Sequence, residues 1–173
     1  MTFDPKAWER HITLPDGRAV FVRPLTPEDE ALYPSFLAAV TPDDLRLRLF
    51  APVRAFTHDF IARFTQFDYA KAMAFIALDG ATGEMLGVAR LHDEADGLAG
   101  EYAILVRSDL KGHGLGWQLM QLIIAYARAK GLRAIDGQVL RENTTMLAMC
   151  RDLGFDIGED PEAAYIDRVR LAL

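Results

Sequence analysis

The sequence predicts a mixed α/β fold, in which one mostly antiparallel central sheet is flanked by helices, on three observations. A β-prone run, a glycine-rich loop and a long apolar-faced segment follow one another over residues 100–130. Three consecutive β-prone runs, 72–79, 83–91 and 101–106, are separated by turn residues, as in an antiparallel meander. A further run, 134–140, should lie parallel to 101–106, because strand–helix–strand crossovers join parallel strands and are right-handed.

Length and composition indicate a single domain. The chain has 173 residues, of which 51% are hydrophobic, and can therefore bury one core of ordinary size. We expect residues 1–17 to form an N-terminal extension that carries the first strand of a hairpin. Residues 18–173 should form the domain itself.

Charge and cysteine content exclude several classes of partner. A net charge of −6, without any Lys/Arg run, argues against binding to nucleic acid or to an anionic membrane. Cys150, the single cysteine, allows neither an internal disulfide nor a Cys-based zinc site, and it suits a reducing compartment. The chain starts without an apolar signal region and has no run long enough to span a membrane. We therefore expect a soluble cytoplasmic protein.

The N-terminal third should contain a hairpin and three short helices. Two β-prone runs within 10–25 flank a Pro-Asp-Gly turn at 15–17, and the second run, 19–23, should open the main sheet. Helices should begin after threonines at positions 26, 41 and 57, each followed by proline or acidic residues. Pro34 should kink or restart the first of them.

The remaining elements are predicted from glycines that end helices and from the alternation of residue types along a strand. Gly131 should end the helix after the glycine loop, Gly154 should end a helix over 144–153, and 164–171 should form a closing strand. The acidic cluster at 92–96 lacks the alternating ligand order of a calcium loop and fits a polar hairpin turn. We expect no metal site.

The glycine loop indicates a phosphorylated ligand. Glycines expose successive backbone N–H groups, and the following helix adds the positive end of its dipole. The loop lacks the Gly-Lys-Ser/Thr of a P-loop, and a G-x-G-x-x-G dinucleotide pattern counted from Gly112 fails at Trp117. Neither a nucleoside triphosphate nor NAD is therefore the expected ligand.

Two motifs resemble those of the GNAT superfamily of acyl-CoA-dependent N-acetyltransferases. Lys111, Gly114 and Gly116 match the loop Gln/Arg-x-x-Gly-x-Gly/Ala, with lysine as a basic variant at its first position. The segment 143–155 matches the second block, an asparagine followed by a helix that closes in Gly-Phe. The resemblance covers roughly residues 18–172. It implies a GNAT fold, in which the parallel strands 101–106 and 134–140 splay apart around the acyl-pantetheine arm.

The resemblance and the loop together define a candidate acetyl-CoA site. The pyrophosphate should rest on the N–H groups of the loop, Lys111 should add a cationic contact, and His113 could donate as well. The family has main-chain contacts to pantetheine just before the loop, an oxyanion-stabilising N–H near Leu105 or Val106 exposed by a bulge, and an asparagine contact. The expected cofactor-binding residues are Leu105, Val106, Lys111, Gly112, His113, Gly114, Leu115, Gly116, Trp117 and Asn143.

Two residues are candidates for catalysis. Glu101 matches the position at which many lysine-modifying members carry a catalytic glutamate, and a strand-end carboxylate is the alternative interpretation. Cys150 stands seven residues after Asn143, where many members have a tyrosine that protonates the leaving thiolate. Cys150 could serve as that acid, CoA could leave unassisted, an acyl-cysteine could form, or Cys150 could simply be a buried helix residue.

The acceptor is less sharply defined than the donor. The two motifs look most like the acetyltransferase domain of bacterial protein lysine acetyltransferases, which typically modify acyl-CoA synthetases. The resemblance thus implies direct acetyl transfer to a protein lysine, with a small amine or a non-catalytic acyl-CoA sensor as alternatives. Arg46 and Arg48, in the second expected helix, could clamp an anion or form a solvated helix face.

Overall fold

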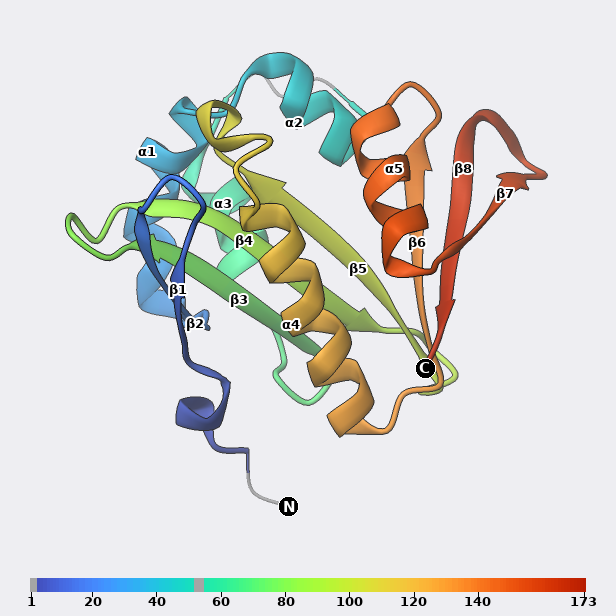
Figure 1. The fold of residues 1–173 in the computed structure, drawn as a ribbon, viewed down its shortest axis with the longest axis horizontal. Coiled ribbons are helices and arrows are strands. Elements are labelled where there is room, and N and C mark those ends of the chain that lie inside the picture. The colour runs from blue at the N-terminus through green and yellow to red at the C-terminus, as the bar shows by residue number, and fades with distance from the viewer. Residues whose placement is uncertain (1–2, 52–54) are drawn as a thin grey trace.

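The computed structural model describes residues 3–51 and 55–173, and an eight-stranded sheet forms its centre (Figure 1). The strand order is β1-β2-β3-β4-β5-β6-β8-β7, and every neighbouring pair is antiparallel except β5 and β6. The strands are β1 Arg10–Thr13, β2 Ala19–Pro24, β3 Ala72–Asp79, β4 Met85–Asp93, β5 Ala99–Val106, β6 Ala134–Leu140, β7 Asp156–Asp160 and β8 Ala163–Ala172. The predicted mixed, mostly antiparallel sheet is confirmed.

The N-terminal hairpin forms as expected and is anchored at both ends. At its turn, the Asp16 carboxylate accepts a hydrogen bond from the backbone N–H of Arg18 at 3.0 Å. Ahead of β1, the 3₁₀ turn Pro5–Trp8 places its indole edge-on against Tyr126, with 5.1 Å between ring centroids. β2 then pairs with β3, so the hairpin belongs to the main sheet. A domain boundary after residue 17 stays a prediction.

Threonine caps and prolines set the starts of the next helices, which are α1 Tyr33–Ala38, α2 Pro42–Leu49 and α3 His58–Thr65. Thr41 and Thr57 accept hydrogen bonds from backbone N–H groups three residues later, as N-caps do. Thr26 instead begins a 3₁₀ segment, Pro27–Leu32, and the α-helix starts only afterwards, with Pro34 in its first turn. Pro34 therefore marks a restart, because a proline fits the first turn of a helix but not its interior.

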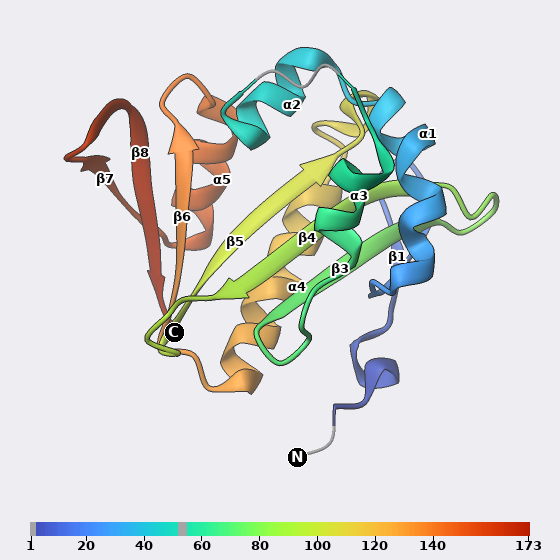
Figure 2. The same ribbon diagram turned by 180° about the vertical axis from the view of Figure 1, so that it is seen from behind.

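Helices cover both faces of the sheet and create two cores. α4, Leu115–Lys130, and α5, Thr144–Leu153, lie over one face (Figure 1), whereas α1 and α3 cover the other (Figure 2). Successive side chains of a strand point to opposite faces, so β3 contributes Phe75 to the first core and Ile76 to the second. Both side chains are fully buried. This double burial explains why β3 reads as an uninterrupted apolar run.

The C-terminal segment departs from the sequence prediction. The sequence predicts no helix or strand between the helix over 144–153 and the closing strand over 164–171, but Asp156–Asp160 forms the edge strand β7, which pairs antiparallel to β8. The prediction is wrong because β7 is short and polar, and its pairing with β8 decides its conformation more than its own side chains do. β4 and β5 are also each two residues longer at their shared turn than expected.

Candidate functional site

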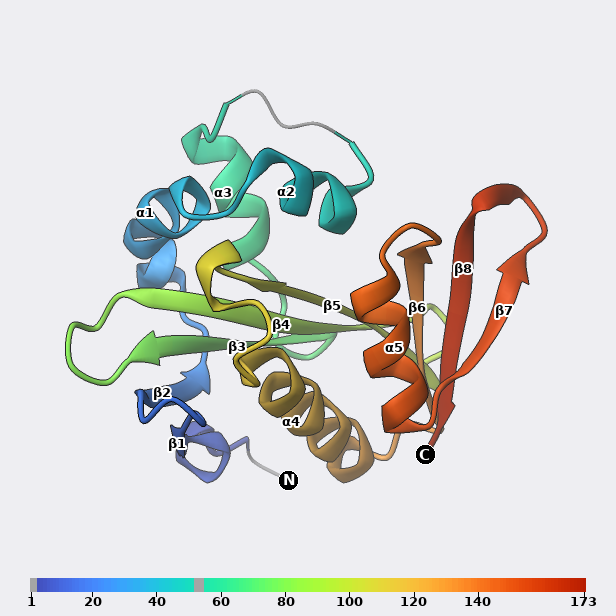
Figure 3. The ribbon, with the colours of Figure 1, turned by 45° about the horizontal axis from the view of Figure 1, so that its top comes forward.

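A groove of about 820 Å³ opens between β5 and β6. The two strands pair at only three positions, the last of which joins Glu101 to Asp136, and they diverge beyond it (Figures 1 and 2). α2 and α5 stand on either side of the opening (Figure 3). The groove is lined by residues of both strands, of α2, of the loop before α4 and of α5. The splayed parallel strands that the family resemblance implied are therefore present.

Tyr102 and Gly137 follow the last paired residues of the two strands. The Tyr102 ring packs so closely over Gly137 that a Cβ at that glycine would come within 2.3 Å of the ring carbon Cε1. Its hydroxyl lies 3.3 Å from Sγ of Cys150 on α5, and its ring lines the groove while only 7% of the residue is exposed. Gly137 thus provides the space that lets Tyr102 lie where the strands separate.

Two hydrogen bonds at the ends of β5 determine which of its backbone groups face the groove. The N–H of Glu94 donates to the Ala99 carbonyl, and the N–H of Arg107 donates to the Leu86 carbonyl, each at 2.9 Å. The register between β4 and β5 is unbroken between these points. Antiparallel pairs alternate between bonded and non-bonded positions. Odd-numbered residues of β5 therefore pair with β4, and even-numbered residues point toward β6.

This alternation leaves the backbone groups of Ile104 and Val106 directed into the gap, because β6 has already diverged there. The N–H of Leu105 points toward β4, so of the two candidates for an oxyanion-stabilising donor only Val106 faces the groove. The bulge expected in β5 is not found, since the β4–β5 register has no shift. Divergence of the strands, in place of a bulge, exposes the donor.

The glycine loop presents a cluster of free backbone donors. Gly112 and Gly114 have φ angles of 81° and 89°, in the left-handed region that favours glycine. In the described part of the chain, no backbone or side-chain group accepts from the N–H groups of 112 and 114–117. Three of these belong to the first turn of α4, where no side chain caps the helix. The junction can bind an anion through N–H groups and the helix dipole.

Lys111 lines the groove beside this cluster and is already paired. Its Nζ lies 2.7 Å from Oδ1 of Asp44 on α2, and the Ser108 hydroxyl donates to Oδ2 of the same carboxylate at 2.6 Å. Burial works to raise the pKa of Asp44, but the hydrogen bonds from Lys111 and Ser108 outweigh it and lower that pKa. Asp44 therefore stays ionised and ties α2 to the loop.

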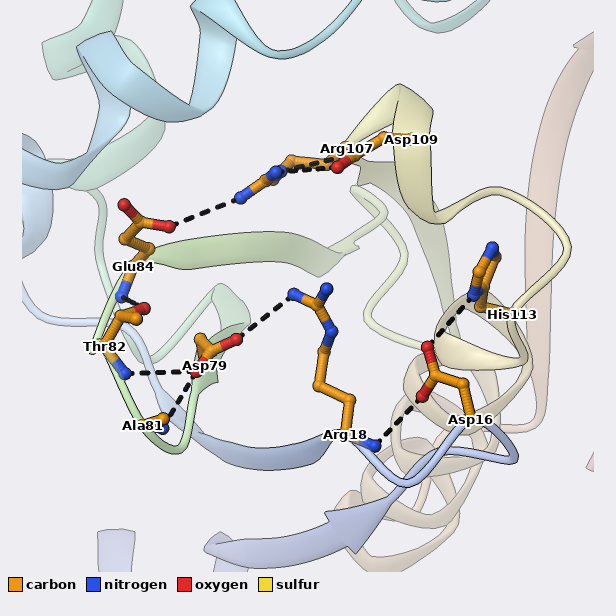
Figure 4. A network of polar contacts seen from close by, with 9 residues as sticks. All are labelled: Asp16, Arg18, Asp79, Ala81, Thr82, Glu84, Arg107, Asp109 and His113. Carbon is orange, nitrogen blue, oxygen red and sulfur yellow. Dashed lines mark hydrogen bonds and ion pairs between the residues drawn. The ribbon is translucent and has the colours of Figure 1, made fainter.

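The N-terminal hairpin holds the other side of the loop. His113 points toward Asp16, with 3.3 Å between Nδ1 and Oδ2, and it does not line the groove (Figure 4). Next to it, Arg18 pairs with Asp79 at 3.1 Å (Figure 4). Figure 4 also shows that Arg107 pairs with the carboxylates of Glu84 and Asp109. His113 thus links the loop to the N-terminal hairpin through Nδ1 and is not part of the groove wall.

Glu101 lies at the point where the two strands separate. Its side chain is exposed, lines the groove and shares a sheet face with Ala103 and Leu105, opposite Tyr102. This is the face that α1–α3 cover, whereas the glycine loop opens toward the face of α4 and α5. Glu101 therefore lines the groove from the α1–α3 side, at the point where the strands begin to diverge.

Cys150 differs from Glu101 in its access to the groove. It is 0% exposed and does not line the groove, and its contact with the groove passes through the Tyr102 hydroxyl. Burial raises the pKa of the Cys150 thiol, and it also raises the pKa of the Tyr102 phenol well above its usual range. Both groups therefore stay protonated.

The other expected cofactor residues are divided between the groove and the core. Asn143 and Trp117 line the groove, and the Asn143 side chain caps α5 by accepting from the N–H of Met146 at 3.2 Å. Gly116 also lines the groove. The Leu115 side chain is buried in the core, so only its backbone N–H can reach a ligand.

The two arginines of α2 have different surroundings. Arg46 pairs with Glu142 at 2.5 Å and with Asp43 at 2.8 Å, in keeping with a solvated helix face. Arg48 is half-buried and lines the groove, so the solvated interpretation is wrong for this residue. The helix turns consecutive positions by about 100°, which separates the two side chains.

Sequence reasoning missed Asp44, Tyr102 and Gly137 at the groove, and also Arg90 of β4, which lines a smaller cavity together with Arg48. Arg90 carried a usable signal, because a charged residue interrupts an otherwise apolar strand. Tyr102 and Gly137 carried none, since their contact joins strands that are distant in the chain.

No group of three His, Cys, Asp or Glu side chains that could hold a metal ion occurs among residues 3–51 and 55–173. In the same part of the chain, none of the helices combines the length and apolar character that a membrane span requires.

The groove and its glycine loop suit a phosphorylated ligand with a long arm, and comparison with known proteins gives the class of protein. Residues 42–155 match the Acetyltransferase (GNAT) family. An acetyltransferase of Pseudomonas aeruginosa is 30% identical over 163 residues, which cover 93% of this chain and 88% of that protein. The chain belongs to the GNAT family and is an acyltransferase, and enzymes of this family use acetyl-CoA as donor.

Two further similarities concern the acceptor. The crystal structure of the GNAT domain of S. lividans PAT superposes with a TM-score of 0.89 and 28% identity, covering 99% of this chain and 100% of that one. This match supports the resemblance to protein lysine acetyltransferase domains. An L-methionine sulfoximine/L-methionine sulfone acetyltransferase of Pseudomonas aeruginosa is 39% identical over 87 residues, or 47% of this chain and 51% of that protein.

Proposed function

We propose that this protein transfers the acetyl group of acetyl-CoA directly to a primary amine within a ternary complex, with a protein lysine as the leading acceptor. The observation that carries the proposal is the position of Glu101, exposed at the point where β5 and β6 separate, on the same strand as the free backbone donors of residues 104 and 106. We also propose a cytoplasmic location, because acetyl-CoA is an intracellular metabolite.

The half of the groove formed by the glycine loop, the start of α4 and the diverging part of β5, which we call the donor half, would bind acetyl-CoA mainly through backbone groups. The pyrophosphate accepts from the free N–H groups of the glycine loop and the first turn of α4, and Lys111 adds a charge-assisted contact. The pantetheine arm runs along β5, where the backbone groups of Ile104 and Val106 face the gap, and passes Asn143 on the opposite wall. Trp117 and Gly116 form the wall at the entry of the helix.

Glu101 would act as the general base. A lysine amine with a pKa near 10.4 is protonated at pH 7, and exposing its lone pair costs about 4.6 kcal/mol. The carboxylate accepts that proton, directly or through one water, as the amine attacks the thioester carbonyl. The N–H of Val106 then stabilises the oxyanion of the tetrahedral intermediate, because it points into the groove without a partner strand.

The leaving thiolate would depart without a direct proton donor. Cys150 has no exposed surface from which to reach the sulfur of CoA, and burial holds its thiol and the Tyr102 phenol in their protonated forms. CoA is itself a stabilised thiolate, since a thiol has a pKa near 8.5. Cys150 then serves to position the Tyr102 ring.

The choice of a protein lysine rests on the likeness to the GNAT domain of S. lividans PAT along both whole chains. A small amine is the second candidate. It is favoured by the 39% identity over 87 residues to an enzyme named for L-methionine sulfoximine and L-methionine sulfone.

The test is transfer of labelled acetyl from acetyl-CoA into a cell lysate, with protein-bound label separated from small-molecule label. We expect label on lysines of one or a few proteins. Glu101→Gln should lower transfer by about 10²- to 10⁴-fold, as removal of a general base does, without weakening acetyl-CoA binding. Glu159→Gln, which changes an exposed glutamate on β7 that does not line the groove, is the matched control.

Three outcomes would contradict parts of this proposal. Label confined to small molecules would replace the protein lysine with a small amine. Acetyl-CoA binding without any transfer would indicate an acyl-CoA sensor. Equal transfer by Glu101→Gln and Glu159→Gln would remove the general base from the mechanism.

A further inference from the structure

Two arginines lie together on the acceptor side of the groove. Arg48 of α2 and Arg90 of β4 both line a second cavity, which holds about 20 Å³ of free space on the face covered by α1–α3. Arg48, Ala103 and Leu105 line this cavity and the groove alike. The small cavity is thus a side pocket of the groove, on the same sheet face as the Glu101 side chain.

Neither guanidinium pairs with a carboxylate of the described residues. In the described part of the chain, no Asp or Glu oxygen lies within 4 Å of Arg48 or Arg90. The residues outside that part, 1–2 and 52–54, include no Asp or Glu. Half-buried arginines elsewhere do have such partners, for example Arg23 with Asp29 at 2.6 Å. Uncompensated cations are costly away from water, so this pair needs an explanation.

The groups that do contact these arginines carry no negative charge. Arg90 donates to the Phe64 carbonyl and stacks over the Phe64 and Phe67 rings, at 5.7 and 5.0 Å from the centroids. The buried Tyr33 hydroxyl lies next to the Arg90 guanidinium, whose charge works against the effect of burial on the Tyr33 pKa, and in the described part of the chain it has no hydrogen bond of standard geometry. Burial raises the pKa of Tyr33 to about 12, so the hydroxyl keeps its proton and can donate.

Electrostatics point to the same conclusion. Burial lowers the pKa of Arg48 and of Arg90, and their mutual repulsion lowers that of Arg48 further, whereas the charge of Glu101 opposes the shift at Arg48. Both guanidinium groups nevertheless stay charged, because an arginine does not lose its proton in a protein. The acceptor side therefore has negative charge at Glu101 and positive charge at the side pocket.

We propose that the acceptor carries a carboxylate close to its reacting amine, and that Arg48, Arg90 and the Tyr33 hydroxyl bind this carboxylate while the amine faces Glu101. The inference rests on the proposed acetyl transfer and defines its substrate class. A carboxylate supplies the missing counter-charge and matches the planar donors of a guanidinium. It can come from a small amino acid or from an acidic side chain next to a target lysine.

The first arm of the test compares two small acceptors, L-methionine sulfone and its carboxamide, by release of the CoA thiol. We expect the carboxylate form to be preferred at least about tenfold in kcat/KM. Arg90→Gln and Arg48→Gln should each lower kcat/KM for the carboxylate form by about 10- to 100-fold, as loss of a charge-assisted hydrogen bond does, and leave the carboxamide within about twofold. Arg63→Gln, at an exposed position on α3 that lines neither cavity, should change neither acceptor.

The second arm compares two lysine peptides of equal length, which have either glutamate or glutamine next to the lysine. A preference for the glutamate peptide that Arg90→Gln abolishes would identify a protein acceptor as the source of the carboxylate. A preference for the carboxylate form in the first arm alone, lost in Arg90→Gln, would identify a small amino acid as the source of the carboxylate. Equal rates within each pair, or equal losses for both members in the arginine variants, would overturn the inference even though transfer occurs.

A binding measurement decides the case in which no acceptor is acetylated. L-Methionine sulfone and its carboxamide are titrated into the CoA-saturated protein and into its Arg90→Gln variant. Binding of the carboxylate form that the variant loses supports the side pocket, although the proposed transfer has then failed. Equal binding of the two compounds, or binding of neither, overturns the inference. Unchanged CoA affinity of the variant shows that it has folded.

Discussion

The two halves of the groove are built from different parts of the polypeptide. The donor half presents backbone donors, from the loop and first turn of α4 and from the even-numbered residues of β5. The acceptor half presents side chains, with Glu101 from β5, Arg48 from α2 and Arg90 from β4. The donor half thus requires a particular backbone conformation, whereas the acceptor half requires particular residue types at positions that are distant in sequence.

This difference explains what a fold family can share. Backbone N–H groups at a helix N-terminus bind a phosphate whatever the side chains are, so one donor site suits many enzymes. Acceptor recognition depends on a few side chains and can change without altering the fold. A substitution in one half should therefore leave the binding properties of the other half unchanged. The four predictions below run from the largest expected effect to the smallest.

Gly137→Ala should have the largest effect, because it disturbs the residues that lie between the halves. The new methyl group would meet the Tyr102 ring at 2.3 Å, and overpacking of this kind lowers the free energy of unfolding by about 1–3 kcal/mol. Gly158→Ala on β7, where a Cβ meets nothing within 4 Å, should change it by less than about 0.5 kcal/mol. Chemical denaturation measures both, and equal stabilities would show that the ring moves aside freely.

Gly114→Ala should damage the donor half alone. At a φ of 89° the alanine costs about 1–2 kcal/mol, and relaxation of the loop would misdirect its N–H groups. We expect acetyl-CoA affinity to fall about 5- to 30-fold by isothermal titration. Gly131→Ala, at the other end of α4 with a φ of 88°, has the same strain and should leave that affinity unchanged. Weakened acetyl-CoA binding in both variants would mean that global destabilisation, and not the loop, is responsible.

Lys111→Gln should weaken acetyl-CoA binding by only about 3- to 10-fold, because backbone donors carry most of the contact and Asp44 already neutralises the ammonium. The loss should shrink at high salt, where surface charges are screened. Lys130→Gln, which removes an ammonium paired with Asp93 at the far end of α4, is the control. A loss beyond about 100-fold at Lys111 would make its side chain, and not the backbone, the main phosphate ligand.

The smallest effect should be a pH dependence of the free energy of unfolding, caused by Glu94 near the closed end of the groove. A hydrogen bond with Asp136, helped by burial and by repulsion, raises the pKa of Glu94 to about 7. The folded state therefore binds more protons than the unfolded state between about pH 4.5 and pH 7, and the free energy of unfolding should fall as pH rises through this window. We expect the change to stay below about 1 kcal/mol, since the pair lies near the surface.

Glu94→Gln should remove this slope, because glutamine keeps a hydrogen-bond donor for Asp136 without titrating. Denaturation from pH 5 to pH 8 measures it, with Glu159→Gln as a control that should retain the slope. A slope that persists in Glu94→Gln would assign the titration to another group.

The local elements could be predicted from the sequence because their signals lie within a few residues of each other. The threonine caps, the Pro-Asp-Gly turn and the glycine stops act through neighbouring backbone groups, and α4 and β6 have nearly the expected bounds. Strand β7 was missed because its pairing with β8, and not its own composition, holds it extended. Cys150 looked like a candidate acid from its spacing, but only packing reveals that Tyr102 covers it.

The sequence by itself determined the donor half of this protein, because glycine conformations and a helix N-terminus are properties of a short continuous segment. The tertiary structure decided the acceptor half. It brings Arg48, Arg90 and Tyr33 to one side pocket, where no carboxylate among residues 3–51 and 55–173 pairs with either arginine. The physical reason is that side-chain contacts between distant elements depend on how those elements pack, which no local pattern records.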